Sequence, residues 1–404
     1  MIRYNIFYKV IEEQRVEKHA LVVGLGFSGA VLARSLADSG FHVTAFDKRS
    51  NIAGNMFEYE RSNGVRVHMY GPHIFHTDRK NVFDYLCRFS SFYPYSHRVL
   101  GMIDGVLVPI PYNFTSINAH FPESKAKVLR KKLSENYALN SRVPISDLLR
   151  HADPEIAGLG QFVFEKVFKN YSAKQWGIPA EKLDPAVLQR VPVVIGDDDR
   201  YFSDSIQMMP LMGFTELFEN ILRHPLIDIQ LTSDALQRIR PHAASGKILL
   251  DGVPFEGPVC YSGSLDELFD YVLGPLPYRS LDLKMEDFAT DAWQSASVVN
   301  YPNEEDFTRI TEFKHITLQE VPQATTIMKE YPIAYRAGGR TVPFYPIQSE
   351  ESSKLYSDYL TLCGKYEDLF LCGRLAEYRY YNMDAVIERA LQVADRIRES
   401  ANYI

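Results

Sequence analysis

The sequence Gly-Leu-Gly-Phe-Ser-Gly at residues 24–29 decides the fold, because it has the G-x-G-x-x-G spacing of a dinucleotide-binding turn. It follows the apolar run Ala20–Val23 and precedes a stretch with the period of an amphipathic helix. In such a turn Gly24 permits the tight bend, Gly26 lets the backbone approach a pyrophosphate, and Gly29 lets the helix pack on the strand. The glycines therefore predict a strand–turn–helix whose helix N-terminus faces phosphates.

The residues after the helix indicate which dinucleotide is bound. The strand-like run 42–46 ends at Asp47, at about the expected distance for binding a ribose hydroxyl. The basic pair Lys48-Arg49 and a second glycine turn ending at Asn55 follow. The first turn suits both FAD and NAD, but a basic pair and glycine turn after the acid are common where the longer FAD lies extended along the domain. We therefore expect FAD.

A second candidate cofactor contact lies near the end of the chain. Gly373-Arg374 ends a strand-like run and precedes the helical pattern that starts at Met383. Backbone N–H groups and a helix N-terminus at this point are suited to a phosphate or a flavin edge. The alternative is a plain turn between a strand and a helix.

Composition excludes several classes of protein. The chain has 404 residues, of which 46% are hydrophobic, so a large core and two or three domains are expected. A net charge of −7 without a long basic run disfavours a nucleic-acid partner, and no apolar stretch approaches a membrane span. Charged residues among the first fifteen disfavour a secretory signal. The four cysteines are scattered, which favours a reduced, cytoplasmic protein with neither a disulfide framework nor a metal site.

The chain reads as α/β at both ends, with a helical and then a mixed middle. We predict a Rossmann-like FAD-binding domain with an inserted helical domain and an inserted antiparallel β-sheet domain. A hairpin is expected around Asp104-Gly105. The predicted segments are an N-terminal extension at 1–19; the FAD-binding domain at 20–90, 205–270 and 350–404; the helical domain at 115–180; and the sheet domain at 91–114, 181–204 and 271–349.

Two motifs in the first half carry candidate site residues. The stretch VHMYGPHIFHT at 67–77 contains three histidines, and no cysteine or acidic cluster completes a metal site around them. We therefore favour a shaped loop that packs against the cofactor. The stretch YSAKQWG at 171–177 is either a core helix with its glycine C-cap or an aromatic platform in a cleft.

Together these stretches resemble the UDP-galactopyranose mutase family over residues 20–398. The resemblance rests on RSNIAGN, YGPHIFHT, YSAKQWG and YFSD, and continues through LDELFDY, YRSL, TRITEFKH, KEYP and GRLAEYRYYNM. It implies a homodimeric isomerase that binds FAD and a nucleotide sugar and interconverts the pyranose and furanose forms of the sugar. In that mechanism N5 of the reduced flavin, reduced by NAD(P)H or a chemical reductant, is the nucleophile on the anomeric carbon.

The resemblance also implies roles for individual residues. His73 matches the histidine loop beside the flavin, and Arg374 matches an arginine near it. Trp176 matches the tryptophan of the sugar pocket, and Tyr171 matches a tyrosine that stacks on the uracil. Further matches concern the phosphates, where the resemblance assigns one arginine and two tyrosines: Arg309, Tyr345 and Tyr380.

Other positions depart from the family pattern on the substrate side. Val194 stands where a second phosphate-binding arginine is expected, and its loss should matter unless Arg200 on the same segment substitutes for it. Four further departures are His97 for an asparagine, Ile206 for a tyrosine, Asn382 for an aspartate and Val167 for a base-stacking phenylalanine. Because the flavin-facing positions are mostly kept, we expect a family member with a shifted substrate. The alternatives are a flavin oxidoreductase of the amine-oxidase or desaturase type and a non-catalytic nucleotide-sugar binder.

Overall fold

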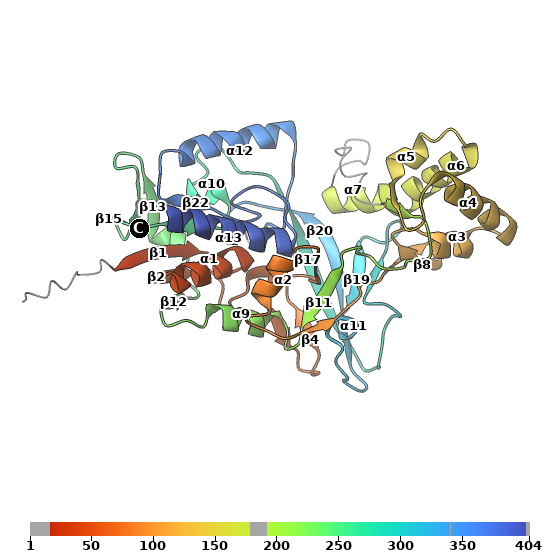
Figure 1. The fold of residues 1–404 in the computed structure, drawn as a ribbon, viewed down its shortest axis with the longest axis horizontal. Helices are drawn as coiled ribbons and strands as arrows, with labels where there is room; N and C mark the ends of the chain where they lie inside the picture. The colour runs from red at the N-terminus through yellow and green to blue at the C-terminus, as the bar shows by residue number, and fades with distance from the viewer. Residues whose placement is uncertain (1–16, 178–191, 340, 401–404) are drawn as a thin grey trace, which may run out of the picture.

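The structure is a computed structural model that describes residues 17–177, 192–339 and 341–400. Figure 1 shows an elongated molecule, with the Rossmann-like strands and their helices at one end, a group of short helices at the other, and a large sheet between them. Most of the predicted extension 1–19 lies outside the described residues, and the first strand already begins at Lys18. Residues 178–191 and 401–404 of the predicted domains also lie outside them.

The predicted Rossmann-like sheet is present as five parallel strands in the order β12-β2-β1-β16-β22. Strand β1 lies at the centre because its Ala20–Val22 side chains are apolar and buried. Helices α1 and α13 pack together against this sheet (Figure 1). The elements are β1 (Lys18–Val23), α1 (Phe27–Asp38), β2 (Phe41–Phe46), β12 (Ile227–Gln230), β16 (Val259–Tyr261), β22 (Leu369–Leu371) and α13 (Met383–Glu399).

The second large sheet has seven strands in the order β21-β17-β20-β19-β18-β7-β8. The predicted hairpin forms β7 and β8, and the sheet is antiparallel except where β18 pairs parallel with β7. Sequence reasoning missed its longest strand, β17, in which exposed Asp282 and Lys284 alternate with inward Leu283 and Met285. The strands are β7 (Val99–Ile103), β8 (Val106–Ile110), β17 (Tyr278–Phe288), β18 (Val298–Asn300), β19 (Arg309–Glu312), β20 (Thr325–Ala334) and β21 (Tyr345–Pro346).

The short helices form a separate hydrophobic cluster that also includes residues of β7 and β8. They are α3 (Phe114–His120), α4 (Glu123–Asn136), α5 (Ile145–Leu149), α6 (Pro154–Val163), a π-helical turn η2 (Phe164–Lys169) and α7 (Asn170–Trp176). Strand β10 (Pro192–Val194) pairs with β9 (Arg142–Pro144) beside these helices. The assignment of residues 192–194 to the sheet domain is therefore wrong, because Val193 is buried in the helical cluster.

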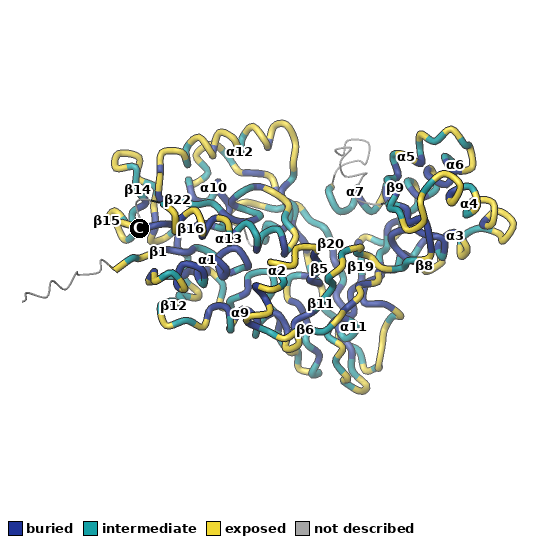
Figure 2. Tube along the Cα trace, viewed as in Figure 1, coloured by how far each residue is buried: buried dark blue, intermediate teal, exposed yellow. Residues whose placement is uncertain are grey.

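The remaining elements are short and flank the Rossmann-like sheet. They are η1 (Gly54–Met56), β3 (Glu58–Glu60), β4 (Arg66–His68), β5 (Phe75–Thr77), α2 (Lys80–Leu86), β6 (Phe92–Pro94), β11 (Ile206–Pro210), α9 (Phe214–Leu222), η4 (Ala235–Gln237), β13 (Ile239–His242), β14 (Lys247–Leu250), β15 (Val253–Pro254), α10 (Leu265–Leu268), α11 (Lys314–Thr317) and α12 (Glu350–Cys363). Because β6 pairs with β11, residues 92–94 belong to this part and not to the sheet domain. Figure 2 shows the buried core following α1 and α13 and, separately, the short helices. Across the described ranges, none of the helices is long and apolar enough to span a bilayer.

Candidate active site

The glycine turn has the geometry that its spacing predicts. Gly24 has a φ of 90°, and its N–H donates to the carbonyl oxygen of Phe46 over 2.8 Å. A Cβ at Gly29 would lie 1.8 Å from the carbonyl oxygen of Gly24, so only glycine lets α1 approach the turn this closely. At the second turn, a Cβ at Gly54 would lie 2.8 Å from the Cα of Gly26. The two turns therefore pack together with their backbones nearly in contact.

Asp47 and Arg49 organise the far side of the turn. The Asp47 carboxylate accepts the N–H groups of Leu25 over 2.8 Å and Arg49 over 2.9 Å. The Arg49 guanidinium lies over the Tyr70 ring at 4.1 Å and donates to Asn55 Oδ1 over 3.0 Å. Each Asp47 oxygen keeps acceptor capacity, which suits a ribose hydroxyl. Lys48 points to the surface, where its Nζ lies 3.3 Å from Glu267 Oε2.

The turn at Gly373 acts differently from the prediction. Its N–H donates to Glu377 Oε2 over 3.0 Å, so it is not offered to a phosphate or a flavin. A Cβ at Gly373 would lie 2.3 Å from Ser28 Oγ, which makes this glycine a close-packing position against the first turn. Arg374 contributes its guanidinium instead, which is braced by the carbonyl oxygens of Phe344 over 3.2 Å and Tyr381 over 2.8 Å.

These segments enclose a cavity of about 820 Å³. Of the predicted cofactor-binding residues, those that line it are Gly24, Gly26, Asp47, Lys48, Arg49, Asn55, His73, Arg374 and Met383. Within the described ranges, Arg49 Nη1 and His73 Nδ1 are buried without a hydrogen-bond partner. A volume of this size, a glycine cradle for phosphates and two buried polar atoms that need partners fit an extended dinucleotide such as FAD.

The histidine loop lies at the inner end of this cavity. His68 Nδ1 accepts the His73 backbone N–H over 3.0 Å, while His68 Nε2 lies 3.0 Å from the buried Glu58 carboxylate. Burial, with the nearby charges of His68 and Arg374, holds the pKa of His73 well below its usual range. His73 is therefore neutral near pH 7. Among the described residues no group of three or more His, Cys, Asp or Glu side chains is placed to hold a metal.

A second cavity of about 340 Å³ lies between the short helices and the seven-stranded sheet. Tyr171, Tyr380 and Asn382 line it, as does Val167. Burial raises the pKa of Tyr171, so its hydroxyl is protonated and can donate a hydrogen bond. This cavity therefore collects residues that the resemblance assigns to the nucleotide.

A group of cations and phenols lies between the two cavities. Arg309 on β19 pairs with buried Glu330 on β20 over 2.7 Å. The Arg374 guanidinium lies over the Tyr380 ring at 4.9 Å and the Tyr345 ring at 5.6 Å. Tyr345 stacks on Tyr380 at 6.2 Å and meets Trp176 edge-on at 6.4 Å. The structure thus gathers the predicted phosphate and sugar residues, and we call this set the bridging cluster: Arg309, Arg374, Tyr345, Tyr380 and Trp176.

Two side chains that lie within the quoted motifs but were given no role hold α7 in place. Lys174 Nζ donates to the carbonyl oxygens of Tyr301 over 2.6 Å, Glu305 over 2.8 Å and Phe307 over 3.2 Å. Arg279 on β17 donates to the carbonyl oxygen of Gln175 at the end of α7 over 3.0 Å. These bonds tie the helix that carries Tyr171 and Trp176 to the sheet.

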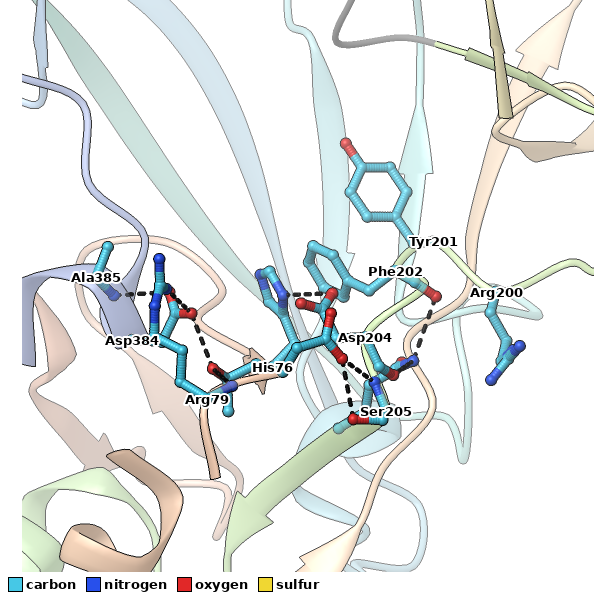
Figure 3. A network of polar contacts seen from close by, with 12 residues as sticks. His76, Arg79, Arg200, Tyr201, Phe202, Asp204, Ser205, Asp384 and Ala385 are labelled. Atoms are coloured by element: carbon cyan, nitrogen blue, oxygen red, sulfur yellow. Dashed lines mark hydrogen bonds and ion pairs between the residues drawn. The ribbon is translucent and has the colours of Figure 1, made fainter. Parts of the chain in front are cut away.

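Four predicted substrate residues belong neither to the lining of the second cavity nor to the bridging cluster. Arg200 is exposed and engaged by Asp198, with Nη2 to Oδ2 at 2.7 Å, and Figure 3 shows it directed away from His76 and Asp204. Val194 is buried in the β9–β10 pair. Ile206 packs against the Rossmann-side core. His97 is buried behind Phe202, and burial lowers its pKa to about 3.

Other side chains line the second cavity although the sequence analysis gave them no substrate role. His76 Nδ1 lies 2.9 Å from Asp204 Oδ2, and its ring stacks on Phe202 at 3.6 Å (Figure 3). Arg142 on β9 also lines it. Nearby, Asp384 in the first turn of α13 accepts from Thr77 Oγ1 over 2.8 Å and pairs with Arg79, which fixes the segment carrying Asn382 (Figure 3). No motif signals Arg142, because its role depends on strand pairing.

Comparisons with known proteins agree with this geometry. A family model described as UDP-galactopyranose mutase matches residues 166–380, and one described as an NAD(P)-binding Rossmann-like domain matches residues 22–89. The chain is 34% identical to a probable UDP-galactopyranose mutase of Klebsiella pneumoniae over 95% of both chains. It is 31% identical to a dTDP-fucopyranose mutase of Escherichia coli, over 93% of this chain and 97% of the other. A crystal structure of reduced UDP-galactopyranose mutase has the same fold, with a TM-score of 0.67 at 14% identity over 95% of this chain and 94% of that one.

The fold and the larger cavity define an α/β protein of the Rossmann-like, dinucleotide-binding class. Within that class, the chain belongs to the UDP-galactopyranose mutase family, which is a family of isomerases. Family and fold together imply a flavin cofactor, in agreement with the sequence-based expectation.

Proposed function

We propose that the protein is an FAD-dependent mutase that interconverts the pyranose and furanose forms of a nucleoside diphosphate sugar. The observation that carries the proposal is the bridging cluster. It joins Arg374, which lines the dinucleotide cavity, to Tyr380, which lines the second cavity, with Tyr345 against both and Arg309 near Tyr345. A diphosphate held there would bring its sugar to the flavin end of the larger cavity.

Each part of the site has its own work. When bound in its reduced form, FAD supplies the nucleophile for the anomeric carbon. Arg309 and Arg374 hold the diphosphate as it leaves and returns. Burial raises the pKa of Tyr345, so this phenol stays protonated and donates to phosphate oxygens. Trp176 gives the sugar an apolar wall, and neutral His73 lines the cofactor cavity.

An activity assay, and not the fold, identifies the sugar and the base of the substrate. The relatives are named for UDP-galactopyranose and for dTDP-fucopyranose. Both are pyrimidine nucleoside diphosphate sugars, and that class is the proposed substrate. The departures at His97, Asn382 and Val167 are the reason to test both.

The test incubates dithionite-reduced enzyme with each pyranose substrate, and with the matching furanose, and separates the products by chromatography. A parallel arm supplies NADH or NADPH as the reductant. The expected result is isomerisation with no net flavin oxidation. Stoichiometric oxidation of flavin by the sugar would show an oxidoreductase, and tight binding without turnover would show a binding protein. We also predict a homodimer and a cytoplasmic location. Light scattering measures the oligomeric state.

A further inference from the structure

The wall of the second cavity contains a cation at an unexpected position. The family pattern expects an arginine at residue 194, where this chain has buried Val194 on β10. In the β9–β10 pair, the residue directly opposite Val194 is Arg142. Residues directly opposite each other in an antiparallel pair project from the same face. The positive charge that is missing at Val194 is therefore present one strand away, on the same side.

The contacts of Arg142 orient it without neutralising it. Its Nη2 donates to the carbonyl oxygens of Arg200 over 3.2 Å and Tyr201 over 3.0 Å. Among the described residues its guanidinium forms no ion pair, but the carboxylates of Asp198 and Asp204 are near enough to favour its charged form, and Asp204 lines the same cavity. The side chain is half-buried in the wall of the second cavity, and burial lowers its pKa. A half-buried guanidinium that faces a cavity without forming an ion pair is suited to an anionic ligand.

Charge counting points to the same ligand. A nucleoside diphosphate ester carries about two negative charges at the pyrophosphate, and oppositely charged groups in a partly enclosed site attract strongly. The charge of Arg309 is already compensated by buried Glu330. Arg374 is on the flavin side, braced by Phe344 and Tyr381. Arg142 is on the opposite, helical side of the second cavity.

Arg200 does not meet this description. Three of its side-chain contacts go to Asp198, at 2.7, 2.9 and 3.1 Å, and its guanidinium is exposed. Its backbone carbonyl instead serves Arg142. The segment therefore supports an arginine on the neighbouring strand rather than supplying one itself.

We propose that Arg142 is the second phosphate-binding arginine of this protein and grips the diphosphate of the nucleotide from the side opposite Arg309. This rests on the proposed function, because it takes the ligand to be a nucleoside diphosphate sugar. The guanidinium is on β9 at residue 142 and not on β10 at residue 194, and the subsite still binds phosphate through an arginine. Arg142 thereby becomes a substrate-binding residue that the family pattern does not mark.

The test measures binding to the oxidised holoenzyme by titration calorimetry, so it does not depend on turnover. UDP and dTDP are the charged probes, and uridine and thymidine are the matched probes without phosphate. Arg142→Ala is expected to weaken diphosphate binding roughly tenfold to a hundredfold, since a hydrogen bond to a charged group contributes about 1.5–3 kcal/mol. Nucleoside binding should change less than about twofold. Arg150→Ala, an exposed arginine of the same helical region, is the control and should change neither.

A swap across the strands makes the test specific. The double variant Arg142→Val with Val194→Arg returns the charge to the position expected in the family and should recover most of the lost diphosphate affinity. Arg142→Lys should recover part of it, and it covers the case in which the swap does not fold. Thermal unfolding of every variant separates misfolding from lost binding.

The outcomes separate the two proposals. Wild-type protein that binds neither UDP nor dTDP would overturn the proposed function and this assignment with it. Diphosphate binding that survives Arg142→Ala would overturn the assignment of Arg142 but not the proposed function. Loss of diphosphate binding in Arg200→Ala would then assign the phosphate contact to Arg200. An equal loss for uridine and UDP would also overturn it, because Arg142 would then act on the shape of the base or ribose pocket.

Discussion

The two cavities differ in how much of their wall is backbone. The larger one runs along the turns at Gly24–Gly26 and Gly54, whose backbones pack closely, and side chains such as Asp47, Arg49 and Arg374 complete its wall. The smaller one is formed by side chains from the short helices, the seven-stranded sheet and the N-terminus of α13. A cavity bordered by such turns has few ways to change, because a Cβ added at Gly29 or Gly54 meets a backbone atom and a Cβ added at Gly24 meets the Ser262 hydroxyl. A cavity built from side chains can exchange its charges between neighbouring positions, as at Arg142 and Val194.

The largest expected effect is on the side-chain cavity. Arg309→Met leaves the Glu330 carboxylate buried and unpaired, which should lower the free energy of unfolding by about 3–5 kcal/mol. Nucleoside diphosphate affinity should fall as well, while bound flavin stays. Denaturant unfolding and calorimetry check these changes. Adding Glu330→Gln should restore much of the stability but none of the affinity, and recovery of both would contradict a binding role for Arg309.

The next effect breaks the larger cavity. Gly29→Ala places a methyl group 1.8 Å from the carbonyl oxygen of Gly24, so the turn must move, at a cost of about 1–3 kcal/mol. The purified protein should contain less flavin per chain, measured by absorbance, and should unfold at a lower temperature. Gly158→Ala in α6 is the matched control, because its Cβ would meet no atom within 4 Å. Full flavin content in Gly29→Ala would show that the turn accommodates the added methyl group without losing the cofactor.

A smaller effect is expected where the short helices join the sheet. Lys174→Met removes three hydrogen bonds to carbonyl oxygens between residues 301 and 307. We expect about 1–2 kcal/mol lower stability and a raised KM, because α7 carries Tyr171 and Trp176. Lys131→Met on the exposed face of α4 should change stability by less than about 0.5 kcal/mol. An unchanged KM for Lys174→Met would show that the hydrogen bonds of Lys174 to the sheet do not affect substrate binding.

The smallest effect tests a site that lines neither cavity. Burial opposes ionisation of Glu312, but bonds from His315, Thr325 and two backbone N–H groups lower its pKa to about 2. The hydrogen bond to Glu312 in turn raises the pKa of His315. The contribution of His315 is full below about pH 6.5, the pKa of an unfolded histidine, and is lost as pH rises through the folded pKa. The contribution of Glu312 is present above pH 4.5, its ordinary pKa, and is lost as pH falls toward 2.

His315→Gln should therefore destabilise the protein more at pH 6 than at pH 8, by less than about 1 kcal/mol. Urea unfolding at the two pH values measures the difference, with and without UDP. Because the pair lines neither cavity, UDP should shift both curves equally. A pH dependence that disappears with UDP would link the pair to the substrate site.

The same difference between the cavities explains what could be predicted from the sequence. Gly24, Gly29 and Asp47 act through local backbone geometry, so their spacing along the chain carries the information. Arg142 acts through its pairing with Val194, about fifty residues away, which no local pattern reveals. Arg200 was a candidate because it is a nearby cation, and the sequence alone does not reveal that Asp198, two residues before it, already binds it. Strand β17 was missed because its apolar residues alternate with charged ones and lack a continuous run.

The π-helical turn at Phe164–Lys169 has a consequence for how this family member can vary in length. A π turn holds one residue more than an α turn, and it directly precedes α7. Deleting a single residue there would let the segment rewind as an α-helix without breaking it. The deletion removes the extra residue that the π turn accommodates, so everything beyond it would keep nearly the same direction around the helix axis. Tyr171 would stay in the cavity wall and Trp176 in the bridging cluster, whereas a deletion within α7 itself would turn the residues that follow by about 100°.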